Sequence, residues 1–256
     1  MGSFDFFGLS LQRLDREAVC RQVAEGMAEG QGGWVLTPNV DLVQQASCEP
    51  AISALYGRAS LRVPDGAPLL WMARLAGHPF PERVAGSDLV WLLAEEAARS
   101  GRRLFLLGGD EGVAAAAGRR LEESYPGLVI AGHFSPRVSI PPTEEEILAV
   151  RDALQASQPD LVFVALGSPK TEYLIDALRA EFPGTWWLGC GISLSFVAGE
   201  IVRAPRWVQR IGMEWFHRLL QEPRRLASRY LQQNLPFAIR GLATALRNRG
   251  GPPALS

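Results

Sequence analysis

Short apolar runs alternate along this chain with longer segments in which apolar residues recur every three or four positions. The runs are bounded by glycine, proline or asparagine, which end strands and open turns. The predicted strands are 9–12, 34–37, 60–63, 103–107, 128–132, 161–166 and 186–188. The intervening segments predict helices over 15–29, 40–47, 51–56, 68–74, 88–99 and 144–156. Strands that alternate with helices predict an α/β fold with a doubly wound, mostly parallel, Rossmann-like sheet.

The sequence predicts which residues cap one of these helices. The segment 77–88 is rich in proline and glycine and precedes the helix that runs to Arg99. Ser and Asp accept hydrogen bonds from the free N–H groups of a first helical turn. Ser87 or Asp88 is therefore expected to cap this helix.

Pro64-Asp65-Gly66 follows a predicted strand and brings a carboxylate to its carboxyl end. Parallel α/β sheets bind their ligands at this edge, and glycine allows a sharp turn or a close approach of the backbone. Asp65 has two readings from its local sequence. It is either a turn acid that caps the next helix or a group that carries chemistry.

Glycine turns follow three other strands. Gly108-Gly109 precedes an alanine-rich helix, Gly167-Ser168-Pro169-Lys170 opens a helix with a cation, and Gly189-Cys190-Gly191 precedes Ser193 and Ser195. A glycine turn at a helix start exposes backbone N–H groups that suit a phosphate. Gly108-Gly109 lacks a full Gly-x-Gly-x-x-Gly pattern, so an ordinary β–α turn remains equally open.

The pattern changes near residue 201, and we expect a sheet domain over 1–200 and a helical appendage over 201–256. Trp207, Ile211, Trp215 and Leu219 recur every four residues and predict a single amphipathic helix. Pro223 is expected to end this helix, and Pro236 to end a second short basic helix before a third begins. Interleaved tryptophan and arginine suit a membrane interface. The alternative is that the apolar stripe packs on the sheet domain.

Charge separates the same two regions. The chain has 256 residues and a net charge of −1. Residues 203–256 carry ten arginines against Glu214 and Glu222, a balance of +8, whereas residues 1–202 carry sixteen basic and twenty-five acidic side chains, a balance of −9. A basic appendage favours anionic partners, either nucleic acid or an anionic membrane.

The cysteines and histidines argue against a metal-binding cluster and against a disulfide-stabilised protein. The three cysteines and three histidines are scattered, so no metal-ligand spacing or disulfide framework is present in the sequence. A reducing cytosol is the expected compartment. Neither a signal peptide nor an apolar run long enough to cross a bilayer is recognisable.

Several short motifs together resemble the WecG/TagA/CpsF family of bacterial glycosyltransferases, in the family's order from about residue 34 to 230. They are Thr37-Pro38-Asn39, Pro64-Asp65-Gly66, Pro81–Asp88, Gly108-Gly109, Tyr125–Leu128, Gly167–Lys170, Gly189–Gly191, Arg203–Pro205, Glu214–Leu219 and Glu222–Arg225. The resemblance implies an inverting enzyme that moves a sugar from a UDP-sugar to a polyprenyl-diphosphate-linked saccharide. Such steps build bacterial cell-surface and exopolysaccharide glycans.

The resemblance also implies roles for residues. Asp65 would be the general base and Arg83 would face the diphosphate. The residues implied to bind substrate are Thr37, Asn39, Gly66, Gly86, Gly108, Gly109, Gly167, Pro169, Lys170, Thr171, Glu172, Gly191 and Ser195. The arginines expected to meet lipid phosphates at the membrane are Arg203, Arg206, Arg210, Arg218, Arg224, Arg225 and Arg229. No metal and no cofactor beyond the UDP-sugar are expected, since the chain has no Asp-x-Asp triplet.

Two positions depart from the family pattern. Thr171 stands where the family has glutamine, and Ser195 where it has aspartate. Both positions are expected near the sugar-nucleotide pocket, so a change of donor is the favoured reading. UDP-glucose is one candidate donor, and UDP-N-acetylmannosamine or its uronic acid is the other.

Two other classes of function are weighed against this one. A non-catalytic nucleotide-binding scaffold could dock at the membrane through the same appendage. Nucleic-acid binding would use the basic appendage, but no nucleic-acid module accompanies it, and no nucleic-acid partner is expected. We expect a cytoplasmic protein, peripheral on the inner face of the cytoplasmic membrane. Self-association as a homo-oligomer is left open.

Overall fold

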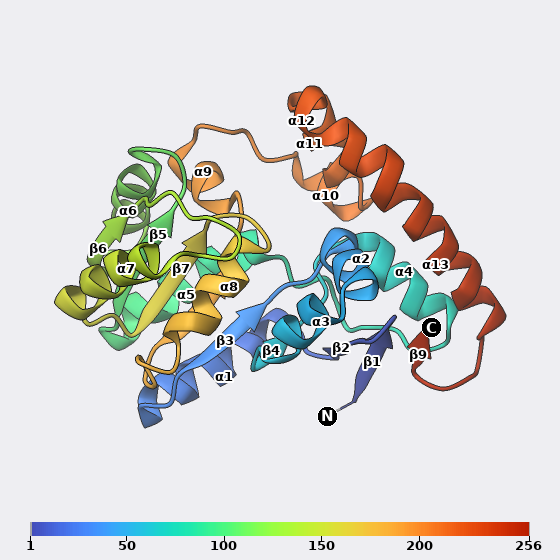
Figure 1. Ribbon diagram of the computed structural model, residues 1–256, viewed down its shortest axis with the longest axis horizontal. Helices are drawn as coiled ribbons and strands as arrows, with labels where there is room; N and C mark the ends of the chain where they lie inside the picture. Colours follow the sequence, from blue (N-terminus) through green and yellow to red (C-terminus); the bar gives the residue numbers. More distant parts are fainter. Residues whose placement is uncertain (1, 256) are drawn as a thin grey trace.

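Six parallel strands form the central sheet of the computed structural model, in the order β4-β3-β8-β7-β5-β6 (Figure 1). The structure describes residues 2–255, apart from the side chains of Arg210, Arg225 and Arg229. The strands are β3 (Gly33–Leu36), β4 (Leu61–Arg62), β5 (Arg103–Gly108), β6 (Val129–Phe134), β7 (Leu161–Ala165) and β8 (Trp186–Gly189). Every neighbouring pair is parallel, which confirms the predicted α/β fold.

Alternate side chains of each strand enter two separate cores, as the period of two in a strand requires. Val162 and Val164 of β7 point to one face, and Leu161 and Phe163 to the other. Helices α2 (Val40–Cys48), α3 (Pro50–Gly57), α7 (Glu144–Ser157) and α8 (Lys170–Leu178) cover the first face. Helices α1 (Arg16–Glu29), α5 (Gly86–Ser100), α6 (Val113–Ser124) and α9 (Ser193–Ala198) cover the second.

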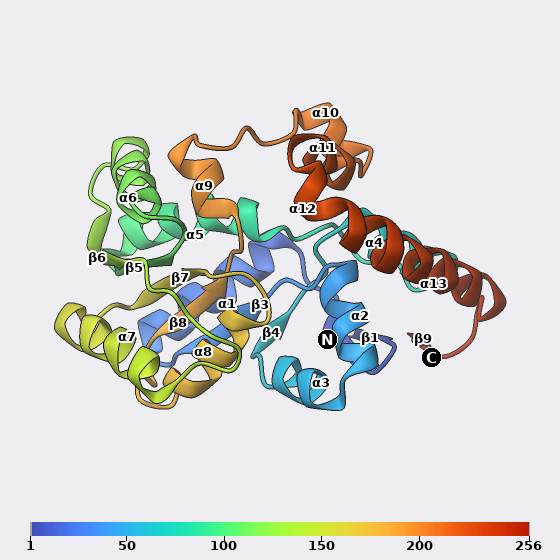
Figure 2. The same ribbon diagram turned by 45° about the horizontal axis from the view of Figure 1, so that its top comes forward.

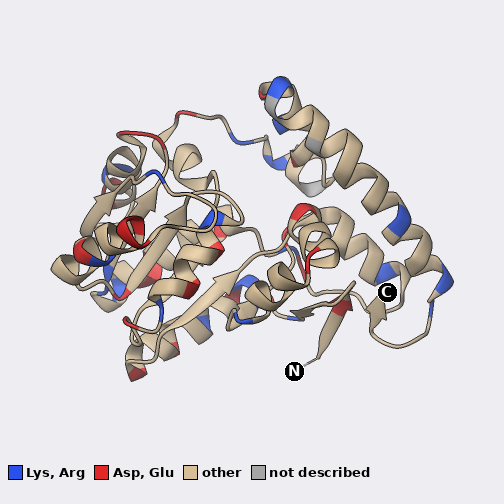
Figure 3. Cartoon of the chain, in the orientation of Figure 1, with Lys and Arg blue, Asp and Glu red and all other residues tan. Residues whose placement is uncertain are grey.

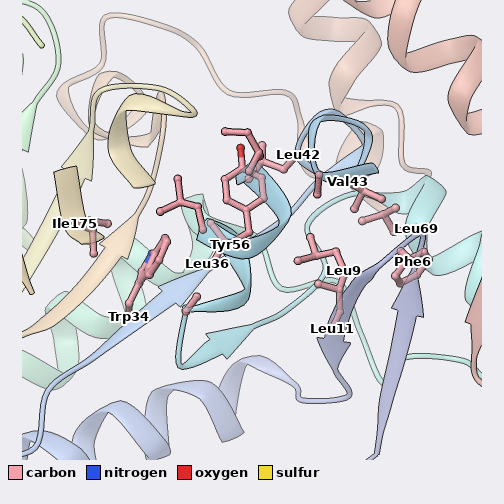
Figure 4. Close-up of a cluster of buried hydrophobic side chains, with 14 of the residues drawn as sticks. Phe6, Leu9, Leu11, Trp34, Leu36, Leu42, Val43, Tyr56, Leu69 and Ile175 are labelled. Atoms are coloured by element: carbon pink, nitrogen blue, oxygen red, sulfur yellow. The ribbon is translucent and has the colours of Figure 1, made fainter. Parts of the chain in front are cut away.

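The first core continues beyond the sheet to a small second sheet. Figure 4 shows Trp34, Leu36 and Tyr56 beside Ile175 of α8, with Phe6 on the far side of the same cluster. The small sheet has the order β2-β1-β9, from β1 (Ser3–Phe6), β2 (Leu9–Gln12) and β9 (Ala254–Leu255). Strand β2 was predicted, whereas β1 and β9 were not; the two residues of β9 give too short a pattern to recognise.

Helices α1 and α5 differ in how their first turns are capped. The Asp15 carboxylate accepts a 2.7 Å hydrogen bond from the backbone N–H of Ala18 and caps α1. Helix α5 begins earlier than predicted, at Gly86, with Ala85 as its cap residue and no side-chain cap. The expectation that Ser87 or Asp88 caps α5 is wrong, because both residues lie inside its first turn.

The appendage is a chain of short helices that crosses the molecule and returns to the N-terminal strand. It comprises α10 (Arg206–Arg210), α11 (Glu214–Gln221), α12 (Pro223–Ala227), the π-helix η1 (Ser228–Asn234), α13 (Leu235–Arg247) and β9. Figures 1 and 2 both show α13 alongside α4 (Ala67–Leu75). Strand β9 then pairs in parallel with β1.

Two details of the appendage correct the sequence prediction. Gly212, at a φ of +75°, separates α10 from α11, so the four-residue stripe from Trp207 to Leu219 does not form one helix. Pro236 is the second residue of α13, which follows η1 directly. The helical path therefore continues through Pro236, and the expected interruption there is wrong.

Candidate active site

Backbone hydrogen bonds bring three separate loops together at the carboxyl ends of β3 and β4. The N–H of Asp65 donates to the carbonyl of Pro38 at 2.8 Å, and the N–H of Val84 donates to the carbonyl of Pro64 at 2.9 Å. The Thr37–Asn39, Pro64–Gly66 and Arg83 segments therefore share one edge of the sheet. The sequence separates them by up to about fifty positions, and the parallel topology places them side by side.

Close packing under this edge explains one of the glycines. A Cβ on Gly86 would lie 3.2 Å from Thr37 Oγ1 and 3.5 Å from the carbonyl oxygen of Gly189. Gly86 thus lets the start of α5 approach the ends of β3 and β8. The Thr37 hydroxyl consequently lies between the start of α5 and the end of β8.

Four charged side chains form a closed cluster next to Asp65. The Glu214 carboxylate accepts a hydrogen bond from Arg83 Nη1 at 2.8 Å and another from Arg203 Nε at 3.0 Å. The Asp88 carboxylate accepts one from Arg203 Nη1 at 2.6 Å and lies 3.9 Å from Arg83 Nη2. Arg83 and Asp88 belong to the sheet domain, and Arg203 and Glu214 to the appendage. We call these four residues the arginine–carboxylate ring.

The ring and its surroundings control the protonation of Asp65. Burial raises the pKa of Asp65 to about 6 from an ordinary 3.8, because a charged carboxylate loses hydration there. The positive charge of Arg83 opposes this shift, and the negative charge of Glu214 reinforces it. Asp65 is thus ionised at neutral pH, yet it is a stronger base than an exposed aspartate.

The alternative role for Asp65 as a helix cap is wrong. The cap residue of α4 is Gly66, and no side chain caps this helix. Gly66 itself has a φ of +123°, a conformation that glycine adopts at little steric cost. Asn39, by contrast, caps helix α2. Its Oδ1 accepts hydrogen bonds from the N–H groups of Asp41 and Leu42 at 2.9 and 3.2 Å.

A second, less charged group of residues lies at the start of α8. Thr171 is buried, and its hydroxyl accepts a 3.3 Å hydrogen bond from the N–H of Leu166. Glu172 is also buried, and burial raises the pKa of its carboxyl to about 7, against hydrogen bonds from its own N–H and from the Ser168 hydroxyl. The Ser168 hydroxyl in turn lies 2.8 Å from the Tyr56 hydroxyl. Lys170, half-buried, is the first residue of this helix.

The glycines in the turns after β5, β7 and β8 allow close backbone contacts or positive φ angles. A Cβ on Gly108 would lie 2.7 Å from the carbonyl carbon of Ala165, and the N–H of Gly109 already donates to the Ala165 carbonyl at 2.9 Å. Helix α6 starts only at Val113, after Gly112. Gly167 and Gly191 have positive φ angles in the turns after β7 and β8. Pro169 precedes α8, and Ser195 is half-exposed on α9.

The predicted membrane arginines have different surroundings. Arg203 belongs to the ring, Arg218 lies 3.9 Å from Glu222, and Arg206 and Arg224 are exposed. The side chains of Arg210, Arg225 and Arg229 lie outside the described residues. Arginines recur along the appendage helices (Figure 3). Exposed large apolar side chains accompany them, namely Val202, Trp207, Ile211, Phe216, Leu220, Leu231, Leu235, Ile239 and Leu246.

Two ring residues were not predicted as site residues. Glu214 was named only in the charge balance and in a family motif, and Asp88 only as a cap and in another motif. One signal was available for Glu214, since it is one of two acids among ten arginines in the appendage sequence. An isolated acid in a basic segment often pairs internally. The signal for Asp88 was its place in the Pro81–Asp88 motif of the family resemblance.

Other features of the described part of the chain lie apart from this edge. One hollow, lined by Arg102, Asp160 and Thr185, lies at the amino ends of the strands, at the opposite edge of the sheet. Within residues 2–255, no cluster of three His, Cys, Asp or Glu side chains is placed to hold a metal ion. No helix among these residues is both long and apolar enough to span a bilayer.

A parallel sheet with a carboxylate and paired arginines at its carboxyl edge makes this chain a Rossmann-like α/β protein with an enzyme-like site. The sequence model of the glycosyl transferase WecG/TagA/CpsF family matches residues 4–251. The chain belongs to this family and is a glycosyltransferase, as the motif resemblance predicted.

Two curated relatives carry the same name, N-acetylglucosaminyldiphosphoundecaprenol N-acetyl-beta-D-mannosaminyltransferase. The protein of Bacillus spizizenii is 33% identical over 197 residues, which is 77% of this chain and 74% of the relative. The protein of Bacillus subtilis strain 168 is 30% identical over 192 residues, or 75% of this chain and 73% of the relative.

Proposed function

We propose that this protein is an inverting, metal-independent glycosyltransferase that moves a sugar from a UDP-sugar to a polyprenyl-diphosphate-linked saccharide. The observation that carries the proposal is the Asp65 carboxylate beside two arginines at the ligand-binding edge of the sheet. The two curated relatives support the acceptor, because their shared name describes a diphosphoundecaprenol-linked N-acetylglucosamine.

In this proposal Asp65 removes the proton from the acceptor hydroxyl. The hydroxyl oxygen forms a bond to the anomeric carbon of the donor sugar, and the bond from that carbon to the UDP oxygen breaks on the opposite face. The proton is transferred to an Asp65 oxygen, and UDP leaves with the bonding electrons. A base whose pKa lies near 6 is ionised at neutral pH and well matched to this task.

The departing UDP gains negative charge that must be stabilised. Arg83 and Arg203 are the cations that lie next to Asp65, and guanidinium groups form strong, directional hydrogen bonds to phosphate oxygens. We therefore assign the diphosphate to these two arginines. Arg203 comes from the appendage, so the appendage is part of the site rather than only a membrane anchor.

N-acetylmannosamine is the sugar that the names of both relatives support, and UDP-N-acetylmannosamine is our first proposed donor. UDP-glucose is the second, because Thr171 and Ser195 differ from the family pattern. The structure weakens one of these two arguments. The Thr171 hydroxyl is buried and bonded to the backbone of Leu166, which is a structural role.

The exposed apolar and arginine side chains of the appendage support a peripheral position on an anionic membrane, where the acceptor lipid resides. We propose the inner face of the cytoplasmic membrane, since UDP-sugars are cytoplasmic metabolites.

A UDP-release assay with a panel of UDP-sugars and a short-chain prenyl-diphosphate N-acetylglucosamine acceptor tests this function. Transfer should survive EDTA, and Asp65→Asn should reduce it by about 10²–10⁴-fold, the usual loss for a missing general base. Asp152→Asn, at an exposed aspartate of α7, is the matched control and should retain full activity. Undiminished transfer by folded Asp65→Asn, or dependence on an added divalent metal, would contradict the mechanism.

A further inference from the structure

The Glu214 carboxylate bridges two guanidinium groups in the way that a phosphate would. Its Oε2 accepts from Arg83 Nη1 at 2.8 Å, and its Oε1 accepts from Arg203 Nε at 3.0 Å. Each oxygen thus serves a different arginine. Carboxylate and phosphate compete for the same guanidinium donors because both present paired oxygen acceptors. Glu214 consequently occupies the position at which these two arginines would meet a diphosphate.

A charge count shows that this arrangement is incompatible with a bound diphosphate. The site contains two guanidiniums, from Arg83 and Arg203, and three carboxylates, from Asp65, Asp88 and Glu214. With all five groups ionised, its net charge is −1. A diphosphate entering next to these groups would meet repulsion from uncompensated carboxylates. One carboxylate must withdraw before the arginines can serve a ligand of this charge.

The structure indicates which carboxylate can move. Asp65 is needed next to the acceptor, and Asp88 lies within α5, which is packed on the sheet through Leu89 and Val90. Glu214 is the first residue of α11, a helix with no buried residue. Of the two ring carboxylates, Glu214 therefore lies on a helix without a buried residue, whereas Asp88 lies on a helix packed into the core.

One nitrogen of Arg203 is also available for a ligand. Arg203 Nη2 is shielded from solvent and has no hydrogen-bond partner among the described residues. A buried guanidinium N–H without an acceptor is unfavourable, and a phosphate oxygen would satisfy it. This observation is independent of the bridging geometry of Glu214, and it points to an anionic ligand at the same position.

We propose that Glu214 is an internal stand-in for the substrate's diphosphate: it holds Arg83 and Arg203 while the site is empty, and an incoming diphosphate displaces it. The inference rests on the proposed function and adds a regulation to the same site. The ligand chemistry is a diphosphate, whether that of the nucleotide donor or that of the prenyl acceptor. Release of Glu214 frees the first turn of α11 from the sheet domain, so ligand binding is coupled to the position of the appendage.

Isothermal titration of the full chain tests this proposal with two probes, UDP and farnesyl diphosphate. Glu214→Gln removes the competing charge and keeps the side chain's shape. It should bind at least one probe about tenfold more tightly than the wild type, since one charge fewer competes for the arginines. The probe that gains affinity identifies the diphosphate, donor or acceptor, that uses the ring. Unchanged or weaker binding of both probes by folded Glu214→Gln overturns the proposal.

Glu222→Gln is the matched control, because it neutralises a glutamate of the same appendage outside the ring. It should bind both probes as the wild type does. An equal gain in Glu222→Gln would mean that general charge removal, not displacement, explains the effect, and would also overturn the proposal.

If Glu214→Gln does not fold, hydrogen exchange of the wild-type protein decides the question. Saturating UDP or farnesyl diphosphate should accelerate exchange in the first turn of α11, and slower or unchanged exchange with both would overturn the proposal. Failure of the proposed function is distinguishable. Tighter probe binding without any sugar transfer would contradict the function alone, and sugar transfer without tighter binding would contradict the displacement alone.

Discussion

The sheet domain and the appendage place their apolar and charged residues in opposite ways. In the sheet, Leu106, Phe163 and Leu188 are completely buried, and charged residues lie mostly outside the cores. In the appendage, Trp207 and Leu220 each expose 66% of their surface. The side chains of Arg203 and Glu214, by contrast, expose only 20% and 16%. The appendage thus turns part of its charge inward and much of its apolar surface outward.

This difference in the placement of apolar and charged residues indicates different roles for the two regions. The buried apolar surface of the sheet domain provides the stability of the fold, because burial of apolar groups is the main favourable contribution to folding. The first part of the appendage contacts the sheet domain through the ion pairs of the ring and through the turn at Gly212, which packs on Ala67 and Trp71. The net energy of such ion pairs is small, so we expect this attachment to be adjustable.

The largest expected effect is on the stability of the sheet domain. Phe163→Ala should lower the free energy of unfolding by about 3–5 kcal/mol, because it leaves a cavity in a fully packed core. Trp207→Ala, the same kind of truncation on the appendage surface, should change it by less than about 0.5 kcal/mol. Urea denaturation of both variants measures the contrast, and similar losses in both would contradict the proposed division of roles.

Membrane affinity should show the reverse dependence. The double variant Trp207→Ser with Leu220→Ser should bind vesicles that contain anionic lipid about 100-fold more weakly, because two large apolar side chains no longer enter the lipid interface. Leu148→Ser, at an exposed leucine of α7 in the sheet domain, should bind as the wild type does. Vesicle co-sedimentation compares the three proteins. Equal binding by all of them would show that the exposed apolar surface of the appendage does not face the membrane.

Each region also contains an enclosed glutamate, and the two differ in their partners. Glu214 pairs with two arginines, whereas burial raises the pKa of Glu172 to about 7. A folded-state pKa above the unfolded value of 4.5 means that the protein loses stability as pH rises from about 4.5 through 7. Glu172→Gln should remove this loss and be more stable than the wild type at pH 8 by up to about 2–3 kcal/mol. Melting curves at pH 5 and pH 8 test this, and a difference that does not grow with pH would contradict it.

The smallest expected effect concerns catalysis and pH. Because Asp65 must be ionised to accept a proton, kcat/KM should fall about tenfold per pH unit below its pKa of about 6. Glu214 raises this pKa, so Glu214→Gln should shift the acid limb of the pH–rate profile to lower pH. Arg83, Asp88 and Arg203 also face Asp65 and remain in the variant. An acid limb that does not move would show that the appendage leaves Asp65 electrostatically undisturbed.

The sheet was predictable from the sequence, whereas the appendage was predictable only as helical. Buried parallel strands such as Leu161–Ala165 can be recognised in the sequence as continuous apolar runs that end near a glycine. Gly212 could not be recognised as a helix break, because the break depends on Ala67 and Trp71 of a distant helix. A residue pattern reports which side of a helix is apolar, but not where another part of the chain will occupy its path.

The candidate site also contains some residues that the sequence predicts and others that it does not. Asp65 and Arg83 could be inferred from motifs that follow strands, because strand ends meet at one edge of the sheet. The partners of Arg83 could not, since Glu214 is 131 positions further along the chain. Asp88 illustrates the difficulty: local sequence favours a cap, yet its carboxylate pairs with Arg203 instead. Ion pairs between distant segments leave no local trace in the sequence.

The pairing of β9 with β1 fixes the far end of the appendage, while residues 199–205 fix the near end to α9. A segment held at both ends can bow outward, but it cannot drift away. Glu214, once displaced by a ligand, would therefore stay at a high effective concentration near Arg83 and return without a search through solution. The cycle of departure and return would then be as fast as product release allows, and independent of protein concentration.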